Sequence, residues 1–372
     1  MSAFKVAFTL KQYTPIIHFQ SDQAGATLRA TELKPKFDRF LLEHVKDLPF
    51  KKNANGEKTL DYKMKIIAIE NKIETIEKIN PNNDRAIPDP LFFGNMGDGE
   101  KKKFAKADEL KIEFLSFDSS VKKAIEEYFE AFLAQSNFGT RQSKGFGCFY
   151  LNKPFNPSLI PFKVYSFTTQ NWKSDIKLLY SFLRQGINLP QGRDKPARFY
   201  CKPAIFTYAI ENNWTWDKKA IKQHFFSNDL KMQQSKYDAK APVNYAGQRA
   251  YLLRDLFGLA SEQSWMSYRM TIKKEHKEIA RFKSPLNFKI IGNQVFFWAD
   301  KSVEMMLNQK FDISAGGKYL PDGLNTPKAF SFDDFFEHVK TIDLSQHIES
   351  KFHKEREFSD LNRILNGIKA SK

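Results

Sequence analysis

The sequence has few cysteines, no long apolar run and no apolar N-terminal segment. Its two cysteines, Cys148 and Cys201, cannot form a disulfide framework or a zinc site by themselves, which favours a reducing compartment. Its longest apolar runs stop well short of the ~18 residues that a membrane-spanning helix needs. Residues 1–5 also lack the apolar core of a signal peptide. These absences predict a cytoplasmic protein with no membrane partner.

Acidic residues are too few to balance the basic ones. The chain of 372 residues contains 59 Lys and Arg but 43 Asp and Glu, which gives a formal net charge of +16. The excess is +3 in residues 1–150 and +13 in residues 151–372. Solubility does not require so large an excess, so the composition predicts a polyanionic partner. With 41% hydrophobic residues the chain can fill two packed domains, and disordered and collagen-like classes are excluded.

Alternating and helical apolar patterns fill residues 1–153. Strands are predicted at 4–10, 62–69, 110–117 and 148–151, and helices at 32–42 and 119–136. The order β-α-β-β-α-β is ferredoxin-like, and RNA-recognition (RRM-like) domains share it. The predicted class is therefore α+β, with a first domain that ends before Pro154, Pro157 and Pro161.

Residues 162–372 are predicted to form a second ferredoxin-like domain, decorated with a helical insertion at about 187–260. A strand followed by a helix opens this domain. Two apolar runs flank Gly292 and Asn293, a pair that suits the tight turn of a β-hairpin. Further helices are predicted near residues 216–226, 248–257, 331–340 and 355–368.

The segment 139–147 joins the second predicted helix to the last strand of the first domain. Its glycines, Gly139, Gly145 and Gly147, allow the backbone to pass close to a ligand, and Arg141 and Lys144 add positive charge. Backbone N–H groups of such a loop can hold phosphates. It is not a Walker loop, because it leaves a helix and enters a strand. The alternative is an ordinary turn with solvated charges.

Four basic residues, Arg29, Lys34, Lys36 and Arg39, flank the N-terminus of the first predicted helix. Positive charge at this end opposes the helix dipole, so helix stability alone would not select them. We therefore predict that they bind phosphate, and the alternative is that these long side chains are simply solvated. The run 101–103, three consecutive lysines, is interpreted as a solvated loop rather than a site.

Two aromatic residues of the loop region have two interpretations. Phe138 and Phe146 can stack on bases, an interaction worth ~1–3 kcal/mol per base. A phenylalanine beside a strand is also a common core residue. The sequence leaves both open.

A histidine beyond the first strand, His18, is a weak catalytic candidate. It could serve as general base on a ribose 2′-OH, with Lys34 or Lys36 stabilising the phosphate. The alternatives are packing and RNA contact. We expect no metal, because helical spacing gives the nearby acidic residues no reason to converge; these are Asp22, Glu32 and Asp38.

Residues 138–147 end in Arg-x-Ser-Lys-Gly-Phe-Gly. This segment resembles the Gly-rich loop of the RAMP superfamily of CRISPR-associated RNA-binding proteins. Residues 14–39 are similar to its basic entry to the first helix. Residues 280–286, with Arg281 and Lys283, resemble the basic-Ser-Pro-Leu turn in the second domain of the type III-B (Cmr-type) effector subunit at the crRNA 3′ end. In the processing endoribonucleases of the superfamily this loop lies near the C-terminus, so the resemblance is to the effector subunit.

The resemblance implies a non-catalytic RNA-binding subunit of a type III CRISPR-Cas effector complex in antiviral defence. Its partners would be crRNA, other RAMP subunits and, as a further candidate, target RNA; no cofactor is expected. One alternative is a metal-independent endoribonuclease of the same superfamily that cuts repeat RNA, and another is a tRNA- or rRNA-binding protein. The residues predicted to bind RNA are Arg29, Lys34, Lys36, Arg39, Gly139, Arg141, Ser143, Lys144, Gly145, Phe146, Gly147, Arg281 and Lys283.

Overall fold

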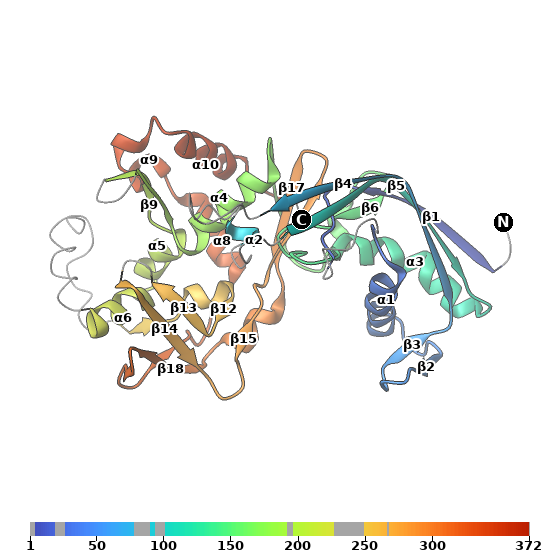
Figure 1. Cartoon of the computed structure of the whole chain (residues 1–372), viewed down its shortest axis with the longest axis horizontal. Helices are drawn as coiled ribbons and strands as arrows, with labels where there is room; N and C mark the ends of the chain where they lie inside the picture. Colours follow the sequence, from blue (N-terminus) through green and yellow to red (C-terminus); the bar gives the residue numbers. More distant parts are fainter. Residues whose placement is uncertain are drawn as a thin grey trace. The chain divides into compact units, whose positions relative to one another are not determined.

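A computed structural model describes residues 4–18, 27–77, 90–93, 101–191, 196–226, 249–265 and 268–371 (Figure 1). It confirms the predicted α+β class. The chain divides into two compact units that are interleaved in sequence. The first unit comprises Met1–Trp172, Asn287–Trp298 and Lys369–Lys372, and the second comprises Lys173–Leu286 and Ala299–Ile368. The predicted domains, 1–153 and 162–372, stay a prediction.

The main sheet of the first unit has four antiparallel strands in the order β4-β5-β1-β6. The strands are β1 (Lys5–Gln12), β4 (Lys63–Glu77), β5 (Lys101–Leu115) and β6 (Phe149–Leu151). Helix α1 (Ala30–His44) follows β1 and helix α3 (Ser119–Gln135) follows β5. The additions to the predicted order are β2 (Phe50–Lys52), β3 (Lys58–Leu60) and α2 (Pro90–Phe93).

Local sequence explains why α3 and β5 form where they do. The Asp118 carboxylate accepts hydrogen bonds from the N–H groups of Ser120 and Val121, which begins α3 at the predicted position. Hydrogen bonds from the Ser120 side chain and this backbone hold the pKa of Asp118 below its usual range. In β5, Ile112 and Phe114 are buried while Lys111 and Glu113 are exposed, as alternation predicts.

Residues 101–103 form the start of β5, so their interpretation as a loop is wrong. They pair in antiparallel register with Glu77, Ile76 and Thr75 of β4. Their backbone hydrogen bonds are therefore part of a long two-stranded ribbon, a role that three consecutive lysines do not signal in the sequence.

A second sheet of the first unit collects strands that are far apart in the sequence. Its order is β16-β17-β7-β21. These strands are β7 (Tyr165–Thr168), β16 (Leu286–Ile291), β17 (Gln294–Ala299) and β21 (Lys369–Ala370). The predicted β16–β17 hairpin is confirmed, and Gly292 in its turn has φ +60°.

The second unit contains most of the remaining helices and a larger sheet. The helices are α4 (Trp172–Arg184), α5 (Ala204–Glu211), α6 (Asp217–Phe225), α8 (Phe332–Thr341), α9 (Leu344–His347) and α10 (Arg356–Gly367). The sheet has the order β10-β11-β20-β18-β14-β13, and β19 pairs with β18. Its strands are β10 (Thr215–Trp216), β11 (Ala250–Tyr251), β13 (Glu262–Trp265), β14 (Met270–Glu275), β18 (Lys310–Ala315), β19 (Lys318–Tyr319) and β20 (Leu324–Asn325).

Two short strand pairs complete the second unit. They are β8 (Ile187–Pro190) with β9 (Ala197–Cys201), and β12 (Leu259–Ala260) with β15 (Arg281–Phe282). The helices predicted at 216–226, 331–340 and 355–368 are confirmed. The helix predicted at 248–257 is wrong for its described part, because Ala250–Tyr251 pairs with β10 and β20 and only a 3₁₀ turn, Arg254–Phe257, follows. Within the described residues, no helix combines the length and apolar character needed to span a bilayer.

Candidate functional site

The Gly-rich loop is bonded on both sides to the segment that follows β1. Phe138 N–H donates to the Gly147 carbonyl at 3.0 Å, and Gly147 N–H donates to the Pro15 carbonyl at 2.8 Å. The Thr14 hydroxyl donates to the Gly145 carbonyl at 2.7 Å and accepts from Cys148 N–H at 2.9 Å. The loop is thus built into the fold of the first unit.

The glycines of the loop are required by the backbone packing itself. Gly139 has φ +80°, and a Cβ there would lie 2.5 Å from the Ile17 carbonyl oxygen. Gly147 has φ +65°, and a Cβ there would lie 1.9 Å from the Phe138 carbonyl oxygen. Both positions exclude a side chain on steric grounds. The glycines were predicted to let the loop backbone pass close to a ligand. They instead let it pass close to other backbone segments of the protein.

Several N–H groups predicted to hold phosphate already donate within the protein. Gly139 N–H donates to the Glu32 carboxylate at 2.5 Å, and Thr140 N–H donates to the Ile17 carbonyl at 2.7 Å. Lys144 and Gly145 N–H donate to carbonyls within the loop. A phosphate would have to displace these partners to be held by the same N–H groups, so the phosphate cradle stays a prediction.

The side chains of the loop differ sharply in exposure. Arg141 is exposed and its Nε donates to the Phe92 carbonyl, whereas Ser143 and Lys144 are half-buried. Phe138 and Phe146 are 0% exposed, and Phe146 packs edge-to-face against Phe92 and Trp172. A ring enclosed in this way cannot stack on a base, so the core interpretation of both phenylalanines is correct and the stacking interpretation is wrong.

One face of α1 meets the loop through Lys36. Its Nζ donates to Gln142 Oε1 at 3.0 Å, to Glu32 Oε1 at 3.2 Å and to the Asn137 carbonyl at 3.4 Å. The ammonium also lies 5.1 Å from the centre of the Phe138 ring. Glu32 therefore holds both Lys36 and Gly139 N–H, and the predicted helix entry and the predicted loop form one cluster.

Lys34 points to a different part of the first unit. Its Nζ donates to Asp38 Oδ2 and to the Leu60 carbonyl, both at 2.8 Å, and lies 3.8 Å from the centre of the Tyr62 ring. Residues two positions apart in an α-helix point about 200° away from each other around the helix axis, so Lys34 and Lys36 lie on different faces of α1. Lys34 fixes β3 to α1, a structural role that the sequence does not distinguish from phosphate binding. Arg39 is exposed.

The remaining candidates at the start of α1 lie near Glu32. The helix begins at Ala30 with Arg29 as its N-cap, and the Arg29 carbonyl accepts from the N–H groups of Glu32 and Leu33. His18 is 8% exposed, and its Nδ1 lies 4.0 Å from Glu32 Oε2. Asp22 lies outside the described residues, and within them no three His, Cys, Asp or Glu side chains form a metal-binding group.

A buried polar cluster next to the Gly-rich loop was not predicted from the sequence. Lys289 of β16 is 0% exposed, and its Nζ donates to the Ser136 carbonyl at 2.9 Å and to Asn137 Oδ1 at 3.2 Å. Asn137 Nδ2 in turn donates to the Gln142 and Phe288 carbonyls, each at 2.8 Å. Burial lowers the pKa of Lys289 to about 8. The only sequence signal is a lysine within an apolar strand.

The buried amine predicts a pH-dependent stability. The folded protein releases the Lys289 proton near pH 8, whereas the unfolded chain releases it near 10.5, so raising the pH removes a destabilising buried charge. We expect this group to add about 2 kcal/mol of unfolding free energy between pH 8 and pH 10. Urea denaturation at both pH values should show this increment in the wild type and lack it in Lys289→Met; equal increments would contradict the assignment.

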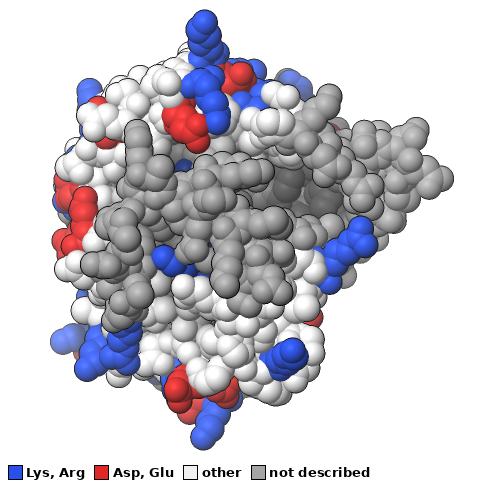
Figure 2. Space-filling model, turned by 90° about the vertical axis from the view of Figure 1, so that its left-hand side faces the viewer, with Lys and Arg blue, Asp and Glu red and all other residues white. Residues whose placement is uncertain are grey.

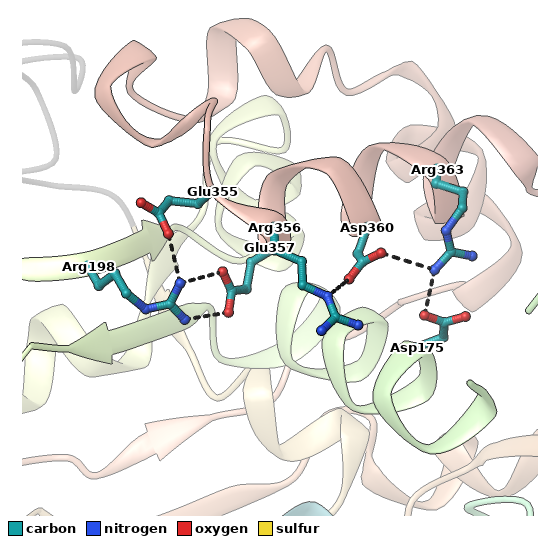
Figure 3. Close-up of polar contacts among 7 residues, drawn as sticks. All are labelled: Asp175, Arg198, Glu355, Arg356, Glu357, Asp360 and Arg363. Atoms are coloured by element: carbon teal, nitrogen blue, oxygen red, sulfur yellow. Dashed lines mark hydrogen bonds and ion pairs between the residues drawn. The ribbon is translucent and has the colours of Figure 1, made fainter. Parts of the chain in front are cut away.

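Several basic residues of the second unit are paired with acidic residues. Arg198 contacts Glu355 at 2.7 Å and Glu357 at 2.5 Å, and Arg363 contacts Asp175 at 2.7 Å (Figure 3). On the face drawn in Figure 2, Lys and Arg stand singly or in small groups among other residues. The net charge alone therefore does not locate a polyanion site in this unit.

The last two predicted residues, Arg281 and Lys283, lie in the second unit at β15. Both are exposed, and both line a pocket of about 510 Å³ together with Tyr180, Arg184 and Ser284. The structure thus brings Lys36 and Gly139 together at Glu32 in the first unit, whereas Lys34 faces β3. Arg281 and Lys283 line a pocket of the second unit.

Family comparison accounts for nearly the whole chain. Residues 3–187 match the model of the Cmr1 N-terminal domain, and residues 200–369 match that of the Cmr1 C-terminal domain. These matches define the class as Cmr-type CRISPR-associated proteins, which the resemblance predicted. The chain belongs to the Cmr1 family.

Two solved structures are similar to this chain at low identity. Cmr1 from Pyrococcus furiosus, in its apo form, is 8% identical with a TM-score of 0.35, and 98% of each chain is covered. A chain of the Type III-B Cmr-beta complex bound to cognate target RNA is 13% identical with a TM-score of 0.29. That match covers 40% of this chain and 59% of the other. No curated protein matches the sequence.

Proposed function

We propose that this protein is a non-catalytic, cytoplasmic RNA-binding subunit of a type III-B CRISPR effector complex, acting in antiviral defence. The observation that carries the proposal is the pair of Cmr1 family matches over residues 3–187 and 200–369. The net charge of +16 supports a polyanionic partner. In this proposal the chain binds crRNA and neighbouring RAMP subunits, with target RNA as a further ligand.

Both four-stranded sheets support a ferredoxin-like topology in the proposed domains. In each sheet the strands stand in the spatial order second, third, first, fourth of a β-α-β-β-α-β sequence: β4-β5-β1-β6 and β16-β17-β7-β21. Helices α1 and α3 connect the strands of the first sheet. Between β7 and β16, the chain contains the helices α4, α5 and α6 and the short strands β8 to β15. RNA-binding domains of this topology are common, which fits the proposed function.

Within the first unit, the proposed RNA contacts are the basic groups around Glu32. Lys36 is half-buried and held by Glu32 and Gln142, while Arg141 is exposed on the loop. A phosphate oxygen beside either cation would accept charge-assisted hydrogen bonds from it. Arg29 and Arg39 extend the basic surface, whereas Lys34 and the loop glycines support the fold.

The proposal is tested by the salt dependence of RNA binding. We expect Lys36→Gln combined with Arg141→Gln to weaken binding of a labelled single-stranded crRNA. The slope of log K against log salt should fall by ~0.7 for each lost phosphate contact, or ~1.4 for two. The measurement is a titration at several salt concentrations, supported by circular dichroism to confirm folding.

A matched control is Lys122→Gln with Lys123→Gln, which removes the same charge from α3 in the same unit. It should leave the slope unchanged. If the Lys36 and Arg141 variant folds normally and keeps the wild-type slope, the proposed contacts are wrong. The non-catalytic part fails if purified protein cuts repeat RNA site-specifically in EDTA and His18→Ala abolishes the cut.

A further inference from the structure

The carboxylate of Glu32 is the acceptor at which several groups of the first unit meet. Glu32 lies in the first turn of α1 (Figure 1). Its Oε1 accepts from Gly139 N–H at 2.5 Å and from Lys36 Nζ at 3.2 Å. Its Oε2 lies 4.0 Å from His18 Nδ1. A loop N–H, an ammonium and an imidazole around one carboxylate are groups that also suit a phosphate.

This cluster can be reached from solvent. The side chain of Lys36 is 32% exposed and that of Glu32 is 18% exposed. Arg141, the other proposed RNA contact, is exposed on the loop that begins at Gly139. A phosphate that approaches Lys36 therefore meets a carboxylate that is already there, and two anions beside one ammonium repel each other. To bind, the phosphate has to replace Glu32 as a partner of Lys36.

Lys36 keeps two other acceptors when it exchanges Glu32 for a phosphate. Its Nζ donates to Gln142 Oε1 at 3.0 Å and to the Asn137 carbonyl at 3.4 Å. An ammonium has three N–H donors, so these two neutral partners can hold it while the third donor changes its acceptor. The cation stays anchored through the exchange, which limits the side-chain entropy that is lost on binding.

We propose that Glu32 is a positioning residue that, in the free protein, occupies the place of an RNA phosphate at Lys36 and Gly139 and thereby limits the affinity for RNA. The inference rests on the proposed function, because the phosphate belongs to a bound RNA strand. It adds an acidic residue, whose neutralisation should strengthen binding, to predicted contacts whose removal should weaken it. A purely structural role of Glu32 would not produce such a gain.

The test is the isosteric substitution Glu32→Gln in the full chain, because the amide keeps an acceptor for Gly139 N–H and Lys36 but has no charge. We expect labelled single-stranded crRNA to bind roughly fivefold more tightly. The gain should vanish in the Lys36→Gln background, since both substitutions act through one ammonium. The control is Glu126→Gln, which breaks another i,i+4 pair, with Lys122 on α3 at 2.9 Å, and should leave the affinity near the wild-type value.

A second variant changes the charge beside the same ammonium in the opposite direction. Gln142→Glu places a carboxylate where Gln142 Oε1 accepts from Lys36, and it should weaken crRNA binding roughly fivefold. Gln294→Glu adds the same charge on β17 of the first unit and is the control. Thermal unfolding shows which variants are folded, and either substitution decides the inference if the other one does not fold.

The outcomes separate this inference from the proposed function. If the wild type binds crRNA but folded Glu32→Gln binds it no more tightly, the inference is overturned and the proposed function stands. The inference is also overturned if the gain persists without Lys36, or if folded Gln142→Glu keeps the wild-type affinity. If neither the wild type nor Glu32→Gln binds crRNA, the proposed function fails and the inference fails with it.

Discussion

Replacing Gly147 with alanine is expected to destabilise the first unit by more than about 4 kcal/mol. The new Cβ would lie 1.9 Å from the Phe138 carbonyl oxygen, 2.8 Å from its carbon and 3.0 Å from the Phe138 nitrogen. All three are backbone atoms, so no flexible side chain can move aside. Relief requires breaking the Phe138 N–H bond to the Gly147 carbonyl, which closes the loop at 3.0 Å. Urea denaturation measures the loss.

Gly292→Ala provides the matched control. Gly292 also has a positive φ, +60°, but nothing lies within 4 Å of a Cβ built there. Its substitution should cost only the left-handed backbone strain, about 1–2 kcal/mol. The difference between the two variants isolates the backbone contact of Gly147. If Gly147→Ala is within about 1 kcal/mol of Gly292→Ala, the loop is not held as described.

Periodicity predicted most of the first unit because its elements are amphipathic. In β5, alternation around Ile112 and Phe114 separates a buried face from an exposed one, and Asp118 gives a clear helix start. The β16–β17 hairpin was equally predictable, since Gly292 in its turn has a positive φ. These sequence signals are local, so the elements can be predicted without knowledge of tertiary contacts.

The candidate site was harder to predict, because its features have two meanings in sequence. A glycine with positive φ allows either a ligand or another backbone segment to pack closely against it. Only the structure shows that Gly139 packs against Ile17 and that Gly147 packs against Phe138. Lys34 and Lys36 are indistinguishable by charge. Their separation into a structural and a loop-facing residue depends on which strand and loop pack against α1.

The charge count was also an incomplete guide, because it does not reveal pairing. Of the second unit's basic residues, Arg254 and Lys274 are both buried. Each is bonded to a buried carboxylate, Asp217 and Asp255 respectively. Each pair adds nothing to the net charge, and its buried cation acts on the stability of the fold instead of attracting a polyanion. Sequence spacing does not indicate these pairs, since their members come from different elements.

The Arg254–Asp217 pair carries the second large prediction: Arg254→Met should lower the free energy of unfolding by about 3–5 kcal/mol. An Arg254 terminal nitrogen lies 2.6 Å from Asp217 Oδ2, and Nε lies 3.2 Å and 3.3 Å from the two carboxylate oxygens. Burial alone would raise the pKa of Asp217, but Arg254 foremost, together with Lys274 and the Lys218 N–H, outweighs it and holds that pKa below its usual range. The variant therefore leaves a buried carboxylate without its hydrogen-bonded guanidinium.

Two controls and a pH series make this prediction specific. Lys340→Met breaks the exposed pair with Glu337 in the same unit and should cost less than about 1 kcal/mol. Asp217→Leu with Arg254→Met removes both charges and should recover most of the loss. In Arg254→Met alone, Asp217 titrates at a raised pKa, so the loss is full at neutral pH and shrinks as the pH falls towards 4. A loss that persists at pH 4, or a double variant as unstable as the single one, would assign the effect to packing of the Arg254 side chain instead of its charge.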